Sequence, residues 1–188
     1  KHFSRNIAKH LYNKDFNLLG ASSANGISSL AAIKKYNFKF NTTDPDEILN
    51  NEDIDTVFIS TRHNTHAEYL IKSIELKKNI FIEKPLTISK KDIEIIEKLL
   101  KNYNKTLIIG YNRRFSPLSV KLKNIINKSN SNVSLIYIIN SGHIDLHHWV
   151  NDEKIGGGRF ISEVCHFIDY IIFLLGTDIT KYNISTTK

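Results

Sequence analysis

The sequence has little of what secreted, membrane-spanning or disulfide-stabilised proteins need. Its 188 residues include one cysteine, Cys165, so an internal disulfide framework is excluded. Its apolar runs, such as residues 170–175, fall far short of the roughly 20 residues of a membrane span. Residues 1–20 carry charges where a signal peptide would have a continuous apolar segment. These absences predict a cytoplasmic protein with no membrane partner.

Metal-binding signatures are missing as well. The chain has 8 histidines, among them the close pair His63 and His66 and the group His143, His147 and His148. A zinc site would add cysteine or carboxylate ligands at defined spacing, and there is one cysteine and no HExxH pattern. The sequence therefore predicts no metal site.

The chain carries a formal net charge of +7, from 26 Lys+Arg against 19 Asp+Glu. A nucleic-acid-binding domain is one interpretation of this excess. However, the lysines are spread along predicted helix surfaces and form no basic stripe with interleaved aromatic residues. We therefore predict no nucleic-acid partner, although a modest positive field favours a phosphorylated ligand.

Short β-branched runs alternate with amphipathic stretches, which is typical of βαβ units around a parallel sheet. Strands are predicted at residues 16–22, 56–61, 79–83 and 106–111, and helices at 4–13, 26–36, 65–77 and 117–128. Two further helices are predicted to begin at caps, one at Asp44-Pro45 and one at Ser89. We expect an α/β fold with a Rossmann-like, doubly wound parallel sheet over residues 1–112.

Residues 113–188 are predicted to form part of an α+β second domain that binds substrate or supports dimerisation. Its expected elements are strands at 133–140 and 179–187 and a helix at 159–175 that Gly176 ends. The chain opens on a helix, whereas a doubly wound sheet opens on a strand followed by a Gly-rich turn. We therefore expect the first strand and the phosphate-binding loop to be missing and the chain to be truncated at both ends.

Polar clusters follow the predicted strands at their carboxyl ends, where open α/β sheets bind ligands. These clusters are Ser22-Ser23, Thr61-Arg62-His63-Asn64, Glu83-Lys84-Pro85 and Asn112-Arg113-Arg114. Any one of them alone is better explained as a cap or a turn. Together they favour a binding cleft for a dinucleotide or a sugar.

The motifs, in this order, resemble those of the Gfo/Idh/MocA oxidoreductases, the glucose–fructose oxidoreductase and inositol dehydrogenase family. The similar segments are Thr61–Glu68, Glu83-Lys84-Pro85, Gly110–Phe115, and Gly156-Gly157-Gly158 with Glu163, Cys165, His166 and Asp169. The resemblance implies an NAD(P)-dependent enzyme that acts on a CH–OH group of a sugar, nucleotide sugar or cyclitol. A non-catalytic nucleotide- or sugar-binding module of the same fold is the alternative.

The resemblance implies that Lys84 is the catalytic lysine and that the Lys84–Pro85 peptide is cis. Alcohol oxidation needs a hydride acceptor and a base for the hydroxyl proton, and a lysine beside NAD⁺ is suited to the second task. His166 is implied to bind the substrate hydroxyl or to assist proton transfer. The family places an Asp one helical turn before this His, where the chain has Ser162 with Glu163 beside it. At i,i+4 and i,i+3 from His166, either residue is a candidate partner, with Glu163 the candidate catalytic one.

The cofactor is predicted to be NAD or NADP, because Ser23 stands where an acidic residue usually binds the ribose hydroxyls. The predicted cofactor contacts are Ser23, Thr61, His63, His66, Glu83, Asn112 and Arg113. The predicted substrate contacts are Lys84, Arg114, His148, Trp149, Ser162 and His166. The substrate class is a small carbohydrate. The resemblance further implies a homo-oligomer or a fusion to another dehydrogenase module.

Overall fold

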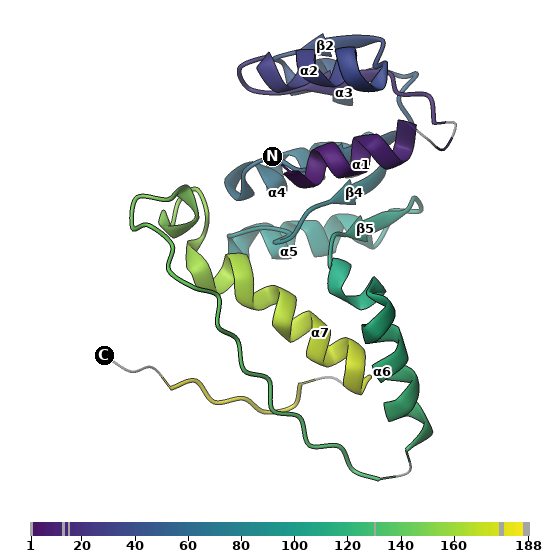
Figure 1. The fold of residues 1–188 in the computed structure, drawn as a ribbon. Coiled ribbons are helices and arrows are strands. Elements are labelled where there is room, and N and C mark those ends of the chain that lie inside the picture. Colours follow the sequence, from purple (N-terminus) through teal and green to yellow (C-terminus); the bar gives the residue numbers. More distant parts are fainter. Residues whose placement is uncertain (1, 13, 15, 130, 177–178, 186–188) are drawn as a thin grey trace. The chain divides into compact units, whose positions relative to one another are not determined.

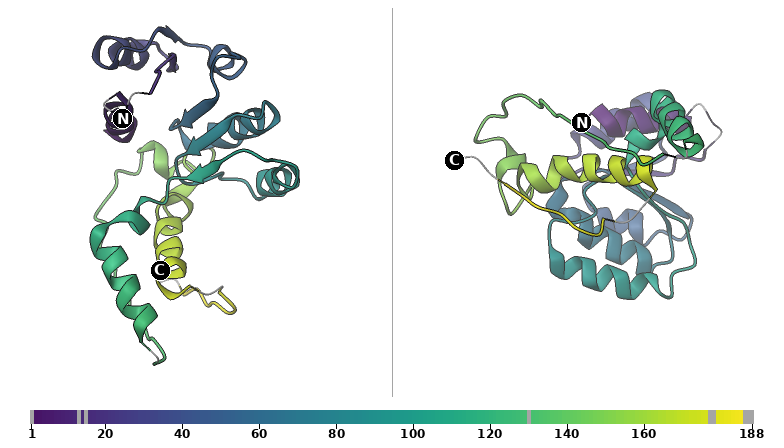
Figure 2. Two further views of the ribbon diagram at one scale, coloured as in Figure 1. Left: turned by 90° about the vertical axis from the view of Figure 1, so that its right-hand side faces the viewer. Right: turned by 90° about the horizontal axis from the view of Figure 1, so that it is seen from below.

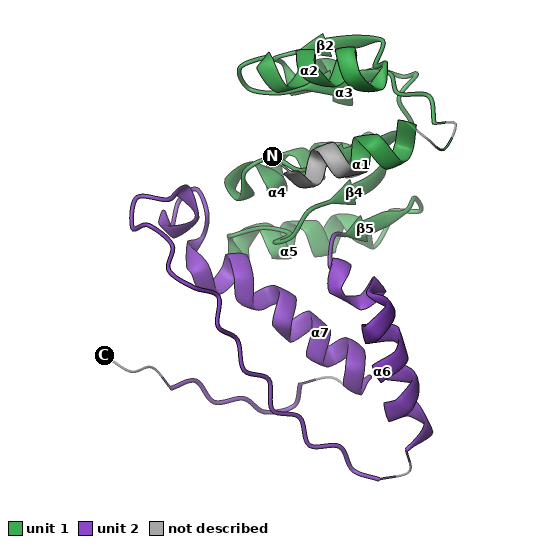
Figure 3. Ribbon diagram, in the orientation of Figure 1, with its two compact units in different colours: residues 1–109 green, residues 110–188 purple. Residues whose placement is uncertain are grey.

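The structure is a computed structural model that describes residues 2–12, 14, 16–129, 131–176 and 179–185. The chain divides into two compact units, residues 1–109 and residues 110–188 (Figure 3). The sequence predicts a division after Asn112, close to this point.

Unit 1 contains two parallel sheets (Figure 1). The first pairs β1 (Gly20–Ser22) with β2 (Phe40–Thr42), and the second contains β3 (Thr56–Ile59), β4 (Asn79–Ile82) and β5 (Leu107–Ile109) in that order. A doubly wound sheet has its first strand at its centre, between the strands that correspond to β1 and β3. Among the residues described, no ladder joins β1 to β3, so the break between the two sheets falls at that position.

The helices of unit 1 follow the predicted pattern. They are α1 (His2–Tyr12), α2 (Ile27–Tyr36), α3 (Pro45–Leu49), α4 (His66–Glu75) and α5 (Lys90–Leu100). Asp44 caps α3 as predicted, because its carboxylate accepts a hydrogen bond of 2.9 Å from the Asp46 N–H. Ser89 occupies the N-cap position of α5, but its hydroxyl makes no capping bond with the residues described.

The core of unit 1 lies between the three-stranded sheet and two helices. Strand side chains alternate in direction, so one face of the sheet presents the buried residues Val57, Ile59, Ile80 and Ile82. Helices α4 and α5 pack together and cover this face (Figure 2). Their own buried residues include Leu70 and Ile96. Burial of this apolar surface is the main source of the unit's stability.

The opposite face of the same sheet carries a row of partly exposed apolar side chains. Phe58 pairs in register with Phe81, and Phe81 with Ile108. The rings of Phe58 and Phe81 stack with their centroids 5.5 Å apart. Phe58 is 41% exposed and Ile108 is 47% exposed, so the residues described leave this face partly open.

Unit 2 is built mainly from α6 (Pro117–Lys128) and α7 (Cys165–Leu175), which pack against each other. The Lys123 ammonium donates a hydrogen bond of 2.9 Å to the Leu174 carbonyl near the end of α7. Gly176 ends α7 in the left-handed conformation, at φ 69°, and its N–H donates to the Ile172 carbonyl. The predicted stop at Gly176 is therefore confirmed.

Several predicted elements differ in the structure. The strands predicted at 133–140 and 179–187 are not formed, because the residues described there run extended with no strand partner, and a strand exists only as part of a ladder. Residues 186–187 of the second prediction lie outside the described part. The predicted helix at 159–175 begins with a π-turn, η4 (Phe160–Val164), that periodicity does not reveal. The three-residue strand β2 is too short to be predicted, and β1 is shorter than expected.

No helix within the described ranges has both the length and the apolar character that crossing a bilayer requires.

The buried face of α4 gives a test of this core. Leu70 is 0% exposed, whereas Leu76, just after the same helix, is 42% exposed. We expect Leu70→Ala to lower the free energy of unfolding by about 2–5 kcal/mol, because it leaves a cavity. The matched Leu76→Ala variant is expected to cost less than about 1 kcal/mol. Urea unfolding followed by circular dichroism measures both, and equal losses would contradict the packing described.

Candidate functional site

The carboxyl ends of β3 and β4 lie side by side, because the two strands are parallel with Ile59 in register with Ile82. The ladder continues one step further, since the Glu83 N–H donates a hydrogen bond of 2.9 Å to the Ile59 carbonyl. Lys84 follows this last bond and is half-buried, and the Lys84–Pro85 peptide is cis, as expected. The ladder therefore holds the predicted reactive lysine at the edge of the sheet where ligands bind.

Glu83 has a carboxylate with one buried oxygen. Its Oε1 atom has no hydrogen-bond partner among the residues described. Burial raises the pKa of Glu83, while the positive charge of Lys84 and a backbone hydrogen bond oppose the rise. An acceptor oxygen of this kind is suited to a hydroxyl or amide donor of a ligand.

His63 and His66, two of the predicted cofactor contacts in the loop after β3, are both buried. His66 is 0% exposed and His63 is 8% exposed, and their rings meet edge to face at 5.6 Å. The His66 ring nitrogens lie 2.7 Å from the Pro85 carbonyl and 3.2 Å from the Thr61 carbonyl. Both nitrogens face backbone carbonyl oxygens, and the contact of His66 with the cofactor stays a prediction.

Ser23 and Thr61 remain at the ends of β1 and β3. The Ser23 hydroxyl accepts a hydrogen bond of 3.1 Å from the Ser29 N–H near the start of α2. Thr61 is exposed, and its hydroxyl accepts a bond of 2.7 Å from the Thr65 hydroxyl. Ser23 thus supports the turn after β1, while the Thr61 hydroxyl is open to solvent.

The polar cluster of unit 2 is organised around Arg114 and Asp169. The Arg114 guanidinium donates to both carboxylate oxygens of the buried Asp169, with 2.7 Å between Nε and Oδ2. This hydrogen-bonded pair raises the pKa of Arg114. Asp169 therefore holds the Arg114 guanidinium, a pairing that no local signal in the sequence reveals. The substrate contact of Arg114 stays a prediction.

Tyr111 lies beside this pair and against His166. Burial raises the pKa of Tyr111 to about 12, so the phenol stays protonated. The Tyr111 and His166 rings meet edge to face at 6.1 Å, and the His166 ring is half-buried. Two neighbours of the cluster, Asn112 and Arg113, are exposed, and the Arg113 guanidinium lies 4.8 Å from the centre of the Phe167 ring.

The π-turn changes the geometry expected around His166. A π-turn closes i→i+5 hydrogen bonds and is wider than an α-helical turn, so the spacing of side chains before His166 differs from that in a regular α-helix. Glu163 forms an ion pair of 3.3 Å with Arg159, which occupies the carboxylate expected to polarise His166. Ser162 is 1% exposed, and its hydroxyl lies 3.4 Å from the Arg159 carbonyl.

His148 and Trp149 lie at the start of a short 3-10 helix, η3 (Trp149–Asn151), with their ring centroids 5.7 Å apart. The Gly156 that opens the glycine triplet packs directly on this helix. A Cβ atom at Gly156 would lie 2.4 Å from the Val150 carbonyl oxygen, so this position accepts only glycine. The first glycine of the triplet therefore anchors the loop that carries His148 and Trp149.

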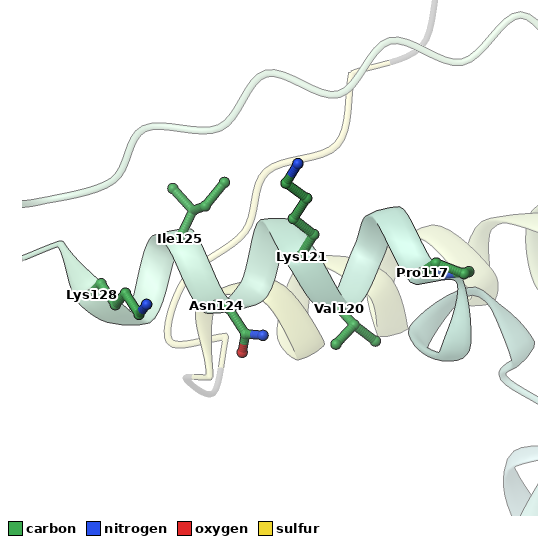
Figure 4. Close-up of a pocket in the computed structure, with 6 residues that line it drawn as sticks. All are labelled: Pro117, Val120, Lys121, Asn124, Ile125 and Lys128. Carbon is green, nitrogen blue, oxygen red and sulfur yellow. The ribbon is translucent and has the colours of Figure 1, made fainter.

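Two hollows of the described surface lie away from these motifs. One runs along α6 between Pro117 and Lys128, with Val120, Lys121, Asn124 and Ile125 around it (Figure 4). It is a shallow depression between exposed aliphatic and lysine side chains of one helix. The strand-end motifs are a better guide to the site, because they bring several polar groups to one edge.

Comparisons with known proteins agree with these motifs. A family model described as "Oxidoreductase family, NAD-binding Rossmann fold" matches residues 2–111. The scyllo-inositol 2-dehydrogenase (NAD(+)) of Bacillus subtilis is 31% identical over 146 residues, which cover 73% of this chain and 40% of that protein. The chain spans about two fifths of the length of the curated relatives it matches.

Two solved structures show the same fold. The myo-inositol 2-dehydrogenase of Lactobacillus plantarum has a TM-score of 0.77 at 22% identity, over 93% of this chain and 53% of that chain. Levoglucosan dehydrogenase in complex with NADH and levoglucosan has a TM-score of 0.72 at 22% identity, over 90% and 50% of the two chains. Both likenesses concern the fold.

The buried carboxylate of Glu83 predicts a pH-dependent effect. The pKa of Glu83 in the folded state lies above the ordinary 4.5. The free energy of unfolding therefore falls as the pH rises from 4.5 through the folded pKa, because the carboxylate ionises in a buried place. We expect Glu83→Gln to raise the free energy of unfolding by about 1 kcal/mol near pH 7 and to have little effect near pH 4. Urea unfolding at both pH values measures this difference. A loss of stability near pH 7 would show that the carboxylate is stabilised by the fold.

The Arg114–Asp169 pair predicts a second difference. Asp169→Asn is expected to destabilise unit 2 by about 2 kcal/mol, because it weakens two charge-assisted hydrogen bonds to a buried group. The matched acid-to-amide change Glu163→Gln removes a more exposed ion pair and should cost less than about 1 kcal/mol. Thermal unfolding of the two variants tests this order, and the reverse order would contradict it.

Proposed function

Because the chain belongs to the Gfo/Idh/MocA family of NAD-binding oxidoreductases, we propose that its activity is that of a dehydrogenase acting on a CH–OH group. The proposed substrate is a sugar, nucleotide sugar or cyclitol. The observation that carries this proposal is the position of Lys84 directly beyond the last ladder bond of β4. The inositol dehydrogenase named among the relatives supports the substrate class.

The residues around β3 and β4 fit a dinucleotide. Glu83 offers a buried acceptor oxygen, and Thr61 offers an exposed hydroxyl at the end of the neighbouring strand. With Ser23 at the end of β1, these groups are proposed to hold the ribose and nicotinamide parts of the cofactor. The bound cofactor supplies a hydride acceptor. Ser23 is uncharged, so both NAD and NADP are candidates.

Lys84 is proposed to exchange the substrate's proton. In oxidation its neutral amine accepts the hydroxyl proton at Nζ, and in reduction its ammonium returns that proton to the carbonyl oxygen. The fixed backbone on which Lys84 stands limits the positions that Nζ can reach. His166 is proposed to bind the substrate hydroxyl, and Ser162 occupies the sequence position of the family's Asp.

The remaining proposals concern the whole protein. We propose a cytoplasmic enzyme that acts as a homo-oligomer or is fused to another dehydrogenase module. His148 and Trp149 are proposed to contact the sugar, because an aromatic ring stacks well on a sugar face.

A non-catalytic binding module is the second candidate. The observation that favours it is Ser162, which is 1% exposed and replaces the acid that the family places one turn before the histidine. Such a module would bind the cofactor and release no reduced product. Calorimetric titration with NAD⁺ and NADP⁺, combined with assays on a sugar and cyclitol panel, separates the two functions.

The proposed role of Lys84 in proton transfer is tested in the full-length gene product. We expect Lys84→Ala to lower kcat for NAD(P)H formation by at least about 100-fold with little change in cofactor affinity, because it removes the proton acceptor. Lys91→Ala removes an exposed lysine from α5 and serves as the matched control. Full activity of the Lys84→Ala variant would refute the mechanism.

A further inference from the structure

His66 is a fully buried histidine whose role in the molecule is not explained by ligand contact. It is the first residue of α4 and is 0% exposed. Its Nδ1 atom lies 2.7 Å from the Pro85 carbonyl oxygen, and its Nε2 atom lies 3.2 Å from the Thr61 carbonyl oxygen. The ring therefore connects the loop after β3 to the segment after β4.

The hydrogen bond between His66 and the Pro85 carbonyl fixes the backbone on the downstream side of Lys84. Upstream of Lys84, the Glu83 N–H donates to the Ile59 carbonyl at 2.9 Å. Downstream, the Pro85 carbonyl accepts from the His66 ring. Lys84 is thus the residue between two hydrogen-bonded anchors, one from the sheet and one from the start of α4.

The ring chemistry selects one tautomer. Both facing atoms are carbonyl oxygens, which only accept hydrogen bonds, and a neutral imidazole has a single N–H. The shorter contact assigns this proton to Nδ1, which donates to Pro85. Burial lowers the pKa of His66 and outweighs the two carbonyl contacts, which raise it, and the charge of Lys84 lowers it further. The neutral Nδ1–H form therefore fits the site at neutral pH.

We propose that His66 is a positioning residue for Lys84: its Nδ1–H holds the Pro85 carbonyl and so fixes the backbone from which the lysine side chain projects. The proposal rests on the proposed function only where it assigns chemistry to Lys84. A merely structural histidine would fill space under α4, and any side chain of similar size and polarity would replace it.

Two amide variants distinguish these roles. The amide nitrogen of Asn reaches the place of a histidine Nδ1, and that of Gln reaches the place of Nε2. His66→Asn keeps a donor for Pro85, so we expect its kcat to stay within about threefold of the wild-type value. His66→Gln moves the donor toward Thr61, and we expect its kcat to fall about 10- to 100-fold with KM nearly unchanged, since a misplaced lysine affects the chemical step. Thermal unfolding of both variants reports any general loss of folding.

A second measurement needs no variant and no activity. Long-range ¹H–¹⁵N spectra of the wild-type chain near pH 7 are expected to show His66 as the neutral Nδ1–H tautomer. An Nε2–H tautomer, or equal kcat values for folded His66→Asn and His66→Gln, would overturn the positioning role. If both variants fail to fold, the tautomer decides. Failure of the proposed function has a different signature, which is full activity of Lys84→Ala whatever the state of His66.

Discussion

The parallel ladder of β3, β4 and β5 is the constraint on which the rest of unit 1 depends. Its register sets Ile59 beside Ile82 and Ile82 beside Ile109, so the strands end at one edge. The buried side chains on one face of the ladder hold α4 and α5 against it. A shift of the strand register by one residue would turn these side chains to the opposite face. The packing that stabilises the unit therefore also fixes the position of Lys84.

Polar groups at this edge are held in places that disfavour their charged forms. Burial raises the pKa of Glu83 and lowers the pKa of His66, so each group is pushed toward neutrality. The two residues differ in their hydrogen bonds: the Nδ1–H of His66 donates to the Pro85 carbonyl, whereas Glu83 keeps a buried oxygen with no partner among the residues described. Core packing has to offset the cost of that oxygen, and such costs are typical of sites arranged for a ligand.

The sequence predicts most of the helices well, because hydrophobic periodicity and capping are local signals. Asp44-Pro45 marks the start of α3 and Gly176 the end of α7, and each depends on a few neighbouring residues. The burial of His66 and the pairing of Arg114 with Asp169 were not predictable in this way, because both join residues far apart in the chain. The strand predicted at 133–140 is absent for a related reason: a run of apolar and β-branched residues indicates that a segment favours a strand, while the strand itself requires a partner.

The π-turn at Phe160–Val164 has a consequence for how this stretch can vary over evolutionary time. A turn of this kind accommodates one residue more than an α-helical turn, and it directly precedes the helix that carries His166 and Asp169. The contacts of that helix with Tyr111 and Arg114 do not involve side chains of the widened turn. Ser162 in this turn is 1% exposed, so a residue that replaces it has to fit a buried space, while the ion pair of Arg114 with Asp169 anchors the helix that follows. The chemistry of the turn and the position of the helix therefore depend on different residues.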